Sequence, residues 1–224
     1  MPPAVIVFDV NETLSDMAPI ADRFADLGAP RQLAATWFAS LLRDGFALAA
    51  AGSAGRFAAL GAGVLRTVLT GVSLNRAIDE AVEHVMSGFA DLAVHPDVGP
   101  GVRALRAAGL RLVTLTNGSV EVSERLLGSA GLRGDFEHLL SVDDAGVWKP
   151  ARQAYEYAAR ACDTDVAEML LVAVHPWDID GAARAGMGTA WINRAGVPYP
   201  DYFTPPQHTV TLLTELPAAI SRAG

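Results

Sequence analysis

The stretch AVIVFDVNETL (residues 4–14) is an apolar run that ends at an acid. Ala4 to Phe8 has the composition of a buried strand, and Asp9 follows it directly, with Asn11 and Thr13 close behind. A single acid at the carboxyl end of a strand can be no more than a solvated terminus. Its significance therefore depends on which residues the rest of the chain brings to the same edge.

The second half of the chain alternates short apolar runs with helical patterns. Such alternation is typical of a parallel sheet with crossover helices. We therefore predict an α/β fold with a Rossmann-like parallel sheet, which the opening strand joins. The further strands are expected at RLVTLT (111–116), HLLSV (138–142), MLLVAV (169–174) and TAWIN (189–193), and the helices near residues 120–130, 152–162 and 179–185.

The segment that follows the opening strand has a different pattern. It lacks a convincing strand and contains helical stretches such as RQLAATWFASLLRDG (31–45), expected to end at Gly45, and NRAIDEAVEHVMSGF (75–89). HPDVGPGV (95–102) has the Pro and Gly content of a linker that returns to the sheet. We predict a core formed by residues 1–14 and 95–224, and a helical cap of residues 15–94 above the carboxyl end of the first strand.

Composition limits the classes of partner. The chain has 224 residues, a net charge of −8 and no dense Lys/Arg cluster, which argues against nucleic acid. Cys162 is the single cysteine, so no intrachain disulfide can form, which fits a reducing compartment. Residues 45–74 are hydrophobic and rich in Ala and Gly, but Arg56 and Arg66 divide them into runs shorter than the ~20 residues that a membrane span needs. No membrane partner is therefore expected. We expect a cytoplasmic protein with a small-molecule substrate, and a homodimer stays open.

Polar residues follow several of the predicted strands. In open parallel sheets, ligands bind outside the carboxyl ends of the strands, so these residues are candidates for a common site. Each is a weak signal alone, but together they supply an acid, a hydroxyl, an amide, a lysine and a His/Asp pair. They are Asp9, Thr116, Asn117, Lys149, His175 and Asp178.

Four segments, in this order, resemble the motifs of the haloacid dehalogenase superfamily of aspartate-nucleophile hydrolases. They are FDVNETLSD (8–16), TLTNGS (114–119), VWKP (147–150) and VHPWDIDGA (174–182). Their surroundings look most like the type II L-2-haloacid dehalogenases. The resemblance covers residues 4–14 and 95 to about 196 and is thin in the predicted cap. It implies the fold of that superfamily, a parallel-sheet core with a cap.

The resemblance implies a carboxylate that attacks carbon or phosphorus and forms a covalent intermediate, which water later cleaves. Asp9 matches the nucleophile, Lys149 its charge partner, and Asp178 the acid near the hydrolytic water. No metal or organic cofactor is needed for that route. Further matched positions are the hydroxyls of Thr13 and Thr116, the substrate-facing amide of Asn117, and Tyr155 near the lysine.

Several positions depart from the family patterns. Asn11 and Val174 stand where the superfamily's phosphatases carry an acid-catalyst aspartate and a metal-binding aspartate. Magnesium prefers carboxylate oxygens, so a magnesium-dependent phosphatase is disfavoured but stays an alternative. The family's halide-binding arginine has no secure match: Ala29 falls near its place, and Arg31 or Arg43 could substitute.

The pocket itself also departs from the dehalogenase pattern. Asn11 replaces an aromatic residue, and Ala173 and His175 replace a serine and an asparagine. His175 could act as a general base on water, since its unperturbed pKa is about 6.5, or could serve only as a structural hydrogen-bonding group. Trp177 is a candidate pocket wall.

The sequence thus predicts a hydrolase in which Asp9 displaces a leaving group from a small, carboxylate-bearing substrate through an aspartyl ester. Two alternatives stay open. One is the magnesium-dependent phosphatase, and the other is a binding protein that keeps the pocket without turnover.

Overall fold

The centre of the molecule is a six-stranded sheet. The structure is a computed structural model that describes residues 3–222. All five strand pairings are parallel, and the strand order is β3-β2-β1-β4-β5-β6. This confirms the predicted α/β fold with a parallel sheet. The strands are β1 (Val5–Phe8), β2 (Arg111–Thr116), β3 (His138–Ser141), β4 (Met169–Ala173), β5 (Gly188–Ile192) and β6 (His208–Val210).

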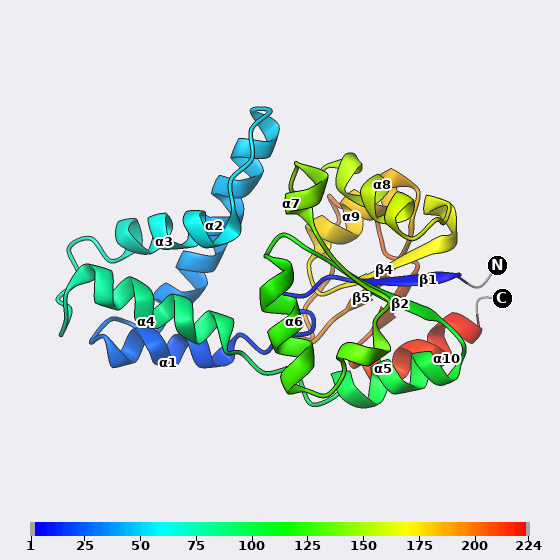
Figure 1. The fold of residues 1–224 in the computed structure, drawn as a ribbon, viewed down its shortest axis with the longest axis horizontal. Helices are drawn as coiled ribbons and strands as arrows, with labels where there is room; N and C mark the ends of the chain where they lie inside the picture. Colours follow the sequence, from blue (N-terminus) through cyan, green and yellow to red (C-terminus); the bar gives the residue numbers. More distant parts are fainter. Residues whose placement is uncertain (1–2, 223–224) are drawn as a thin grey trace.

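Helices cover both faces of the sheet (Figure 1). Alternate residues of β1 point to opposite faces, so Val5 and Val7 pack on one side while Ile6 and Phe8 pack on the other. The first side is covered by α8 (Arg152–Ala161) and α9 (Pro176–Ala185), and the second by α5 (Val98–Ala107), α6 (Val120–Ser129) and α10 (Leu216–Ser221).

The central position of β1 decides where Asp9 lies. The four residues of β1 are fully buried, and burial of each side chain contributes about 1.5–3 kcal/mol. β1 pairs with β2 on one edge and with β4 on the other. Asp9 therefore leaves the sheet between the carboxyl ends of two neighbouring strands, where the residues that follow β2 and β4 can reach it.

Four helices lie between β1 and α5 along the chain and form the left part of Figure 1. Ser15 and Val94 form an antiparallel bridge where the chain leaves the sheet region and where it returns. The boundaries of a cap at residues 15–94 stay a prediction. The helices are α1 (Ala18–Asp26), α2 (Leu33–Ala50), α3 (Phe57–Val68) and α4 (Ile78–Ala90).

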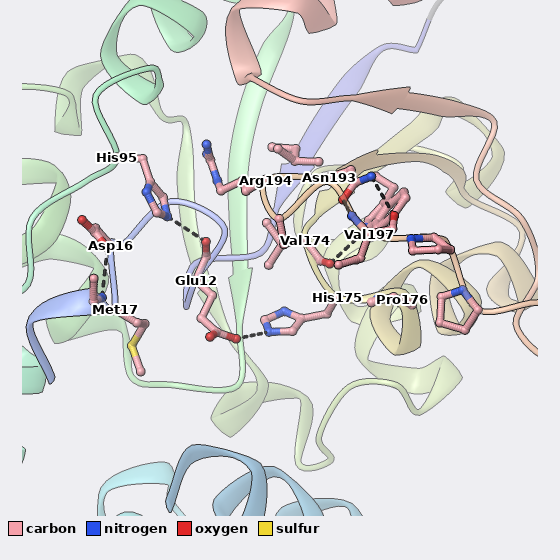
Figure 2. A pocket seen from close by; sticks show the side chains of 16 residues that line it. Glu12, Asp16, Met17, His95, Val174, His175, Pro176, Asn193, Arg194 and Val197 are labelled. Atoms are coloured by element: carbon pink, nitrogen blue, oxygen red, sulfur yellow. Dashed lines mark hydrogen bonds and ion pairs between the residues drawn. The ribbon is translucent and has the colours of Figure 1, made fainter. Parts of the chain in front are cut away.

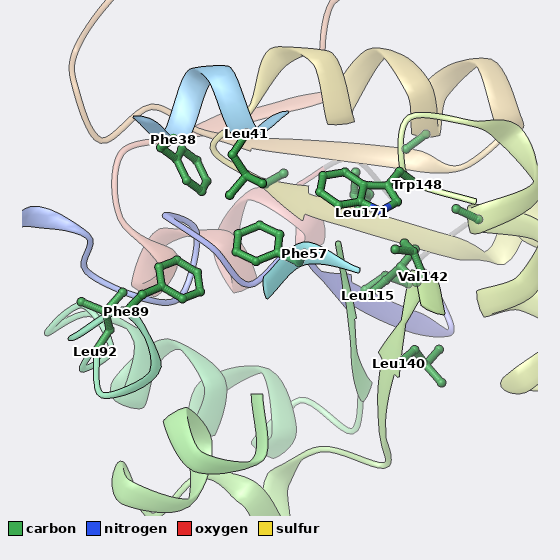
Figure 3. Packing of buried hydrophobic residues seen from close by; sticks show 14 of the residues in the cluster. Phe38, Leu41, Phe57, Phe89, Leu92, Leu115, Leu140, Val142, Trp148 and Leu171 are labelled. Atoms are coloured by element: carbon green, nitrogen blue, oxygen red, sulfur yellow. The ribbon is translucent and has the colours of Figure 1, made fainter. Parts of the chain in front are cut away.

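Aromatic side chains connect these helices to the loop that precedes α8 (Figure 3). Phe57 of α3 stacks on Trp148 with ring centroids 5.9 Å apart, and on Phe89 of α4 at 5.2 Å. The indole N–H of Trp148 donates to the carbonyl of Gly55 at 2.9 Å. The position of the loop around Trp148 thus depends on α3 and α4 as well as on the sheet.

Two details of the sequence-based prediction were wrong. α2 continues through Gly45 to Ala50, because this glycine makes room for Trp148: a Cβ there would lie 2.3 Å from the indole ring. The segment 95–102, expected as a linker, contains the start of α5 at Val98. Its Pro100 falls in the first turn, where a helix needs no N–H donor.

Three smaller features were also not predicted. β6 is only three residues long, too short for a periodic signal. The third predicted strand ends at Ser141, and α7 (Val142–Ala145) follows it. α9 begins at Pro176 rather than Ile179. The remaining short 3₁₀ segments are Arg133–Asp135, Val166–Glu168 and Leu213–Glu215. Among residues 3–222, no helix combines the length and apolarity that crossing a membrane requires.

Replacing Gly45 by Ala is expected to lower the free energy of unfolding by about 1–3 kcal/mol, the usual cost of overpacking. Helix propensity alone would make Ala more stabilising than Gly here. The expected loss of stability therefore comes from the clash with Trp148. Chemical denaturation measures the change. Gly63→Ala in α3 is the matched control, because nothing lies within 4 Å of a Cβ added there. Equal effects of the two substitutions would contradict this account of Gly45.

Candidate active site

Three side chains from distant parts of the chain meet at the carboxyl edge of the sheet. Lys149 places its Nζ 2.9 Å from Oδ1 of Asp9 and 2.6 Å from Oδ2 of Asp178. Asp9 follows β1, Lys149 lies in the loop before α8, and Asp178 lies in the first turn of α9. Lys149 and Asp178 are fully buried and Asp9 is 3% exposed. One buried ammonium therefore bridges two buried carboxylates.

The electrostatics distinguish the two carboxylates. Burial works to raise the pKa of Asp9, but the charge of Lys149 and the hydrogen bond and charge of His175 outweigh it and hold that pKa well below its usual range. Burial raises the pKa of Asp178, with the charge of Lys149 opposing it. Burial disfavours the charged form of Lys149, yet both carboxylates together raise its pKa. Asp9 is thus ionised, and Asp178 is the carboxylate that more readily takes a proton.

Thr13 directs a proton at Asp9. Its hydroxyl donates to Oδ2 of Asp9 at 2.6 Å and accepts from the backbone N–H of Val174 at 3.1 Å. Because the N–H of Val174 uses a lone pair of this hydroxyl, the hydroxyl proton points to the carboxylate. Thr13 is fully buried, so the arrangement is fixed by its surroundings.

Three residues predicted to contact substrate bond to other groups of the protein, and their contacts with substrate stay predictions. The amide of Asn117 accepts from the backbone N–H of Lys149 at 3.0 Å and donates to its carbonyl at 3.3 Å. The hydroxyl of Tyr155 donates to Oδ1 of Asp178 at 2.6 Å. The hydroxyl of Thr116 accepts from the N–H of Gly118 at 2.9 Å. We infer that Asn117 and Tyr155 position Lys149 and Asp178 and that Thr116 shapes the turn after β2.

His175 lies between two carboxylates. Its Nδ1 is 3.1 Å from Oδ2 of Asp9, and its Nε2 is 2.8 Å from Oε2 of Glu12. Carboxylates only accept hydrogen bonds, so both ring nitrogens must carry protons. Burial works to lower the pKa of His175, but its bonds to Asp9 and Glu12 outweigh this and raise it to about 9. A protonated imidazole has no free lone pair, so the predicted general-base role is not supported.

Glu12 is a pocket position whose partner the sequence did not reveal. Its backbone has a positive φ of 60°, rare outside glycine, and its carbonyl lies 3.0 Å from Nε2 of His95. The acid was visible in FDVNETL, but its partner His175 is 163 residues away, and no local pattern connects the two.

Arg194 also supports the site from a distance in sequence. It donates to the backbone carbonyl of Thr13 and to the carboxylate of Asp97, each at 2.9 Å. Asp97 in turn accepts from the N–H of Leu213 at 2.6 Å. The turn that carries Thr13 is therefore tied to the loop after β5.

Glu12 lines two cavities beside the turn. One, of about 410 Å³, also involves His175, His95, Trp191 and Arg194; Figure 2 shows Glu12 and His175 joined across it. The other, of about 460 Å³, lies against α1 and α2. His175 thus both lines the first cavity and contacts Asp9.

The remaining predicted pocket residues differ in burial and in their neighbours. Trp177 is half-buried, with its ring 5.0 Å from that of His175 and 4.9 Å from that of Phe46. Asn11 is buried, and its predicted contact with substrate stays a prediction. Arg31 and Arg43, the candidates for an anion-binding arginine, pair at the surface with Asp22 and Asp44.

The residues present do not fit a magnesium site. Asp9 and Asp178 both bond to the ammonium of Lys149, and the apolar Val174 stands where a further carboxylate would be needed. Within residues 3–222, no group of three or more His, Cys, Asp or Glu side chains is placed to hold a metal ion.

Replacing Lys149 by Met is expected to lower the free energy of unfolding at neutral pH by about 3–5 kcal/mol, because it leaves buried carboxylates without their cation. The loss should shrink as the pH falls, since a protonated carboxyl needs no counter-charge. Denaturation at several pH values measures this. Arg125→Met, which removes an exposed pair with Asp91, is the control and should change little. Similar losses in both variants would refute the central role of Lys149.

Comparison with known proteins agrees with this arrangement. A model of the haloacid dehalogenase-like hydrolases matches residues 3–186. The (S)-2-haloacid dehalogenase of Pseudomonas sp. (strain YL) is 31% identical over 211 residues, which cover 93% of this chain and 90% of that protein. The haloacetate dehalogenase H-2 of Moraxella sp. (strain B) is 38% identical over 125 residues, 56% of each chain.

Solved structures agree as well. The L-2-haloacid dehalogenase RSc1362 has a TM-score of 0.92 at 29% identity, covering 99% of this chain and 100% of that one. A dehalogenase solved with an intermediate complex has a TM-score of 0.89 at 28% identity, with 96% of both chains covered. The resemblance inferred from the four motifs is confirmed, and the chain belongs to the haloacid dehalogenase-like hydrolase family.

Proposed function

We propose that this hydrolase acts on 2-haloacids, with Asp9 as the nucleophile that displaces the halide. The observation that carries the proposal is the ionised, buried carboxylate of Asp9, bonded on one oxygen to Lys149 and on the other to Thr13 and His175. A carboxylate stripped of water and held in one orientation is a usable nucleophile. The names of the relatives supply the substrate class.

The first step is a displacement at carbon. Oδ1 of Asp9 accepts one hydrogen bond and Oδ2 accepts two, so Oδ1 has the freer lone pair. A bond forms between Oδ1 and the substrate carbon while the carbon–halogen bond breaks, and the halide leaves with the electron pair. The product of this step is an aspartyl ester on Asp9.

The second step is hydrolysis of the ester. Water attacks the carboxyl carbon of Asp9, and Asp178 accepts a proton from it, as its raised pKa favours. The bond between that carbon and Oδ1 then breaks, and the substrate leaves as a hydroxy acid. The oxygen of the attacking water stays in Asp9.

We also propose that residues 15–94 act as a cap over this site. Phe38 and Phe46 of α2 lie near the rings of His175 and Trp177, and the cavity of about 460 Å³ lies between the turn after β1 and helices α1 and α2. Excluding bulk water would favour the displacement over competing solvation of the carboxylate. A small-molecule substrate and a cytoplasmic location stay predictions that fit this function.

Asp9→Asn is expected to reduce halide release from (S)-2-chloropropionate by at least about 10³-fold, since it removes the nucleophile. Halide release and the mass of the intact protein measure the loss of turnover and of the ester adduct. Asp91→Asn, which alters an exposed carboxylate, is the control and should retain activity.

Heavy-oxygen water separates this route from others. In a single turnover of the parent protein, we expect the label in Asp9, because water attacks the carboxyl carbon of the protein. Label only in the product would contradict the ester mechanism. Magnesium-dependent release of phosphate from an aryl phosphate, lost in Asp9→Asn and without halide release, would favour the phosphatase alternative. No reaction with any substrate would favour a binding protein.

A further inference from the structure

We propose that His175, as an imidazolium held by Glu12, stabilises the oxyanion that forms on Oδ2 of Asp9 when water attacks the ester. This inference rests on the proposed function and concerns its second step alone. It assigns His175 as a catalytic residue and Glu12 as a positioning residue.

The geometry already presents two donors to one oxygen. Thr13 donates to Oδ2 of Asp9 at 2.6 Å, and Nδ1 of His175 lies 3.1 Å from the same oxygen. If Oδ1 forms the ester bond, Oδ2 becomes the carbonyl oxygen of the ester. Attack by water on the carboxyl carbon moves an electron pair onto Oδ2, where both donors stand. Donors in place before the charge develops lower the barrier most, because no reorganisation is needed.

The bonds and protons balance along this step. The water oxygen bonds to the carboxyl carbon of Asp9 while one water proton passes to Asp178, and the negative charge develops on Oδ2. When the tetrahedral species collapses, the bond between that carbon and Oδ1 breaks and the hydroxy acid takes the proton from Asp178. The second proton of the water stays on the carboxyl group of Asp9 and is released to solvent when that group ionises again. His175 donates a hydrogen bond throughout and transfers no proton.

Glu12 has a specific part in the ester form. In the free protein, His175 has two carboxylate neighbours, Asp9 and Glu12. Once Asp9 is esterified, it carries no charge, and Glu12 alone remains to keep His175 protonated. Its position is held by the bond of its carbonyl to His95 and of its N–H to the hydroxyl of Ser15 at 3.3 Å.

The charged and titratable surroundings of His175 are few. Asp9 and Glu12 contact it directly, from the end of β1 and from the turn that follows. On the sides of α9 and α2, the neutral rings of Trp177 and Phe38 lie next to it. The other charged or titratable groups near it are Lys149, on the far oxygen of Asp9, and Asp16, His95 and Arg194, which line the same cavity.

The test is a single-turnover experiment with (S)-2-chloropropionate on the parent, His175→Gln and Glu12→Gln. Halide release reports the first step, and the mass of the ester-loaded protein reports the second. In His175→Gln, we expect ester hydrolysis to slow by about 10²-fold or more, while halide release falls far less because Lys149 and Thr13 still hold Asp9 ionised. Ester-loaded protein should therefore accumulate. Glu124→Gln, which alters an exposed pair with Arg133, is the control.

Glu12→Gln supplies a readout that a merely structural role would not give. Without this carboxylate the pKa of His175 in the ester form falls, so the alkaline limit of ester hydrolysis should move to lower pH by one unit or more. At lower pH, where the imidazolium is restored, the rate of ester hydrolysis in the variant should approach that of the parent. If His175→Gln fails to fold, the pH profile of Glu12→Gln still tests the proposed role of His175 in ester hydrolysis.

Two outcomes would overturn the inference alone. One is ester hydrolysis at the parent rate in His175→Gln, and the other is an unshifted pH profile in Glu12→Gln. A parent protein that releases halide but never carries an ester would instead overturn the proposed function, and this inference with it.

Discussion

The ammonium of Lys149 between two buried carboxylates is the interaction on which the rest of the site depends. Its Nζ lies within 3 Å of both Asp9 and Asp178, and none of the three has more than marginal contact with solvent. Buried charges are tolerated only when they are paired and hydrogen-bonded. The protein meets this condition with side chains that hold the charged groups in place, such as Asn117 on the backbone of Lys149 and Tyr155 on Asp178.

The need to pair buried charges also accounts for the second positively charged group of the site, His175. One ammonium shared by two carboxylates leaves a net negative charge, and His175 supplies a further proton donor to Asp9 on the opposite oxygen. Glu12 then compensates His175, so positive and negative side chains alternate from Asp178 to the border of the cavity near Glu12. Such an alternation keeps Asp9 ionised although it is buried, which is the state that nucleophilic attack requires.

Packing connects this charged centre to the four helices between β1 and α5. Trp148 precedes Lys149, stacks on Phe57 and bonds to the carbonyl of Gly55. Gly45 lets α2 approach the same indole closely. A displacement of α2 or α3 would therefore also displace Trp148, the residue next to Lys149. Helices that hold no charged residue of the site still contribute to its geometry.

The sequence by itself determined five of the six strands and the residues at the carboxyl edge of the sheet. RLVTLT (111–116) becomes a strand with the predicted bounds, because a buried central strand requires a continuous apolar run that is visible locally. Asp9, Lys149 and Asp178 could be placed together for a related reason. Parallel strands end at one edge, so residues just after them meet there whatever lies between.

Only the tertiary structure decided the features that depend on contacts between distant residues. Gly45 continues a helix instead of ending it because Trp148 lies against it, and residues 95–102 enter a helix because Gly101 leaves room for Leu213. The pKa of His175 is raised, which favours a cation over a general base, because Glu12, 163 residues away, lies on its second nitrogen. Periodicity reports how a segment is buried, whereas the charge state of a side chain is set by the neighbours that folding brings to it.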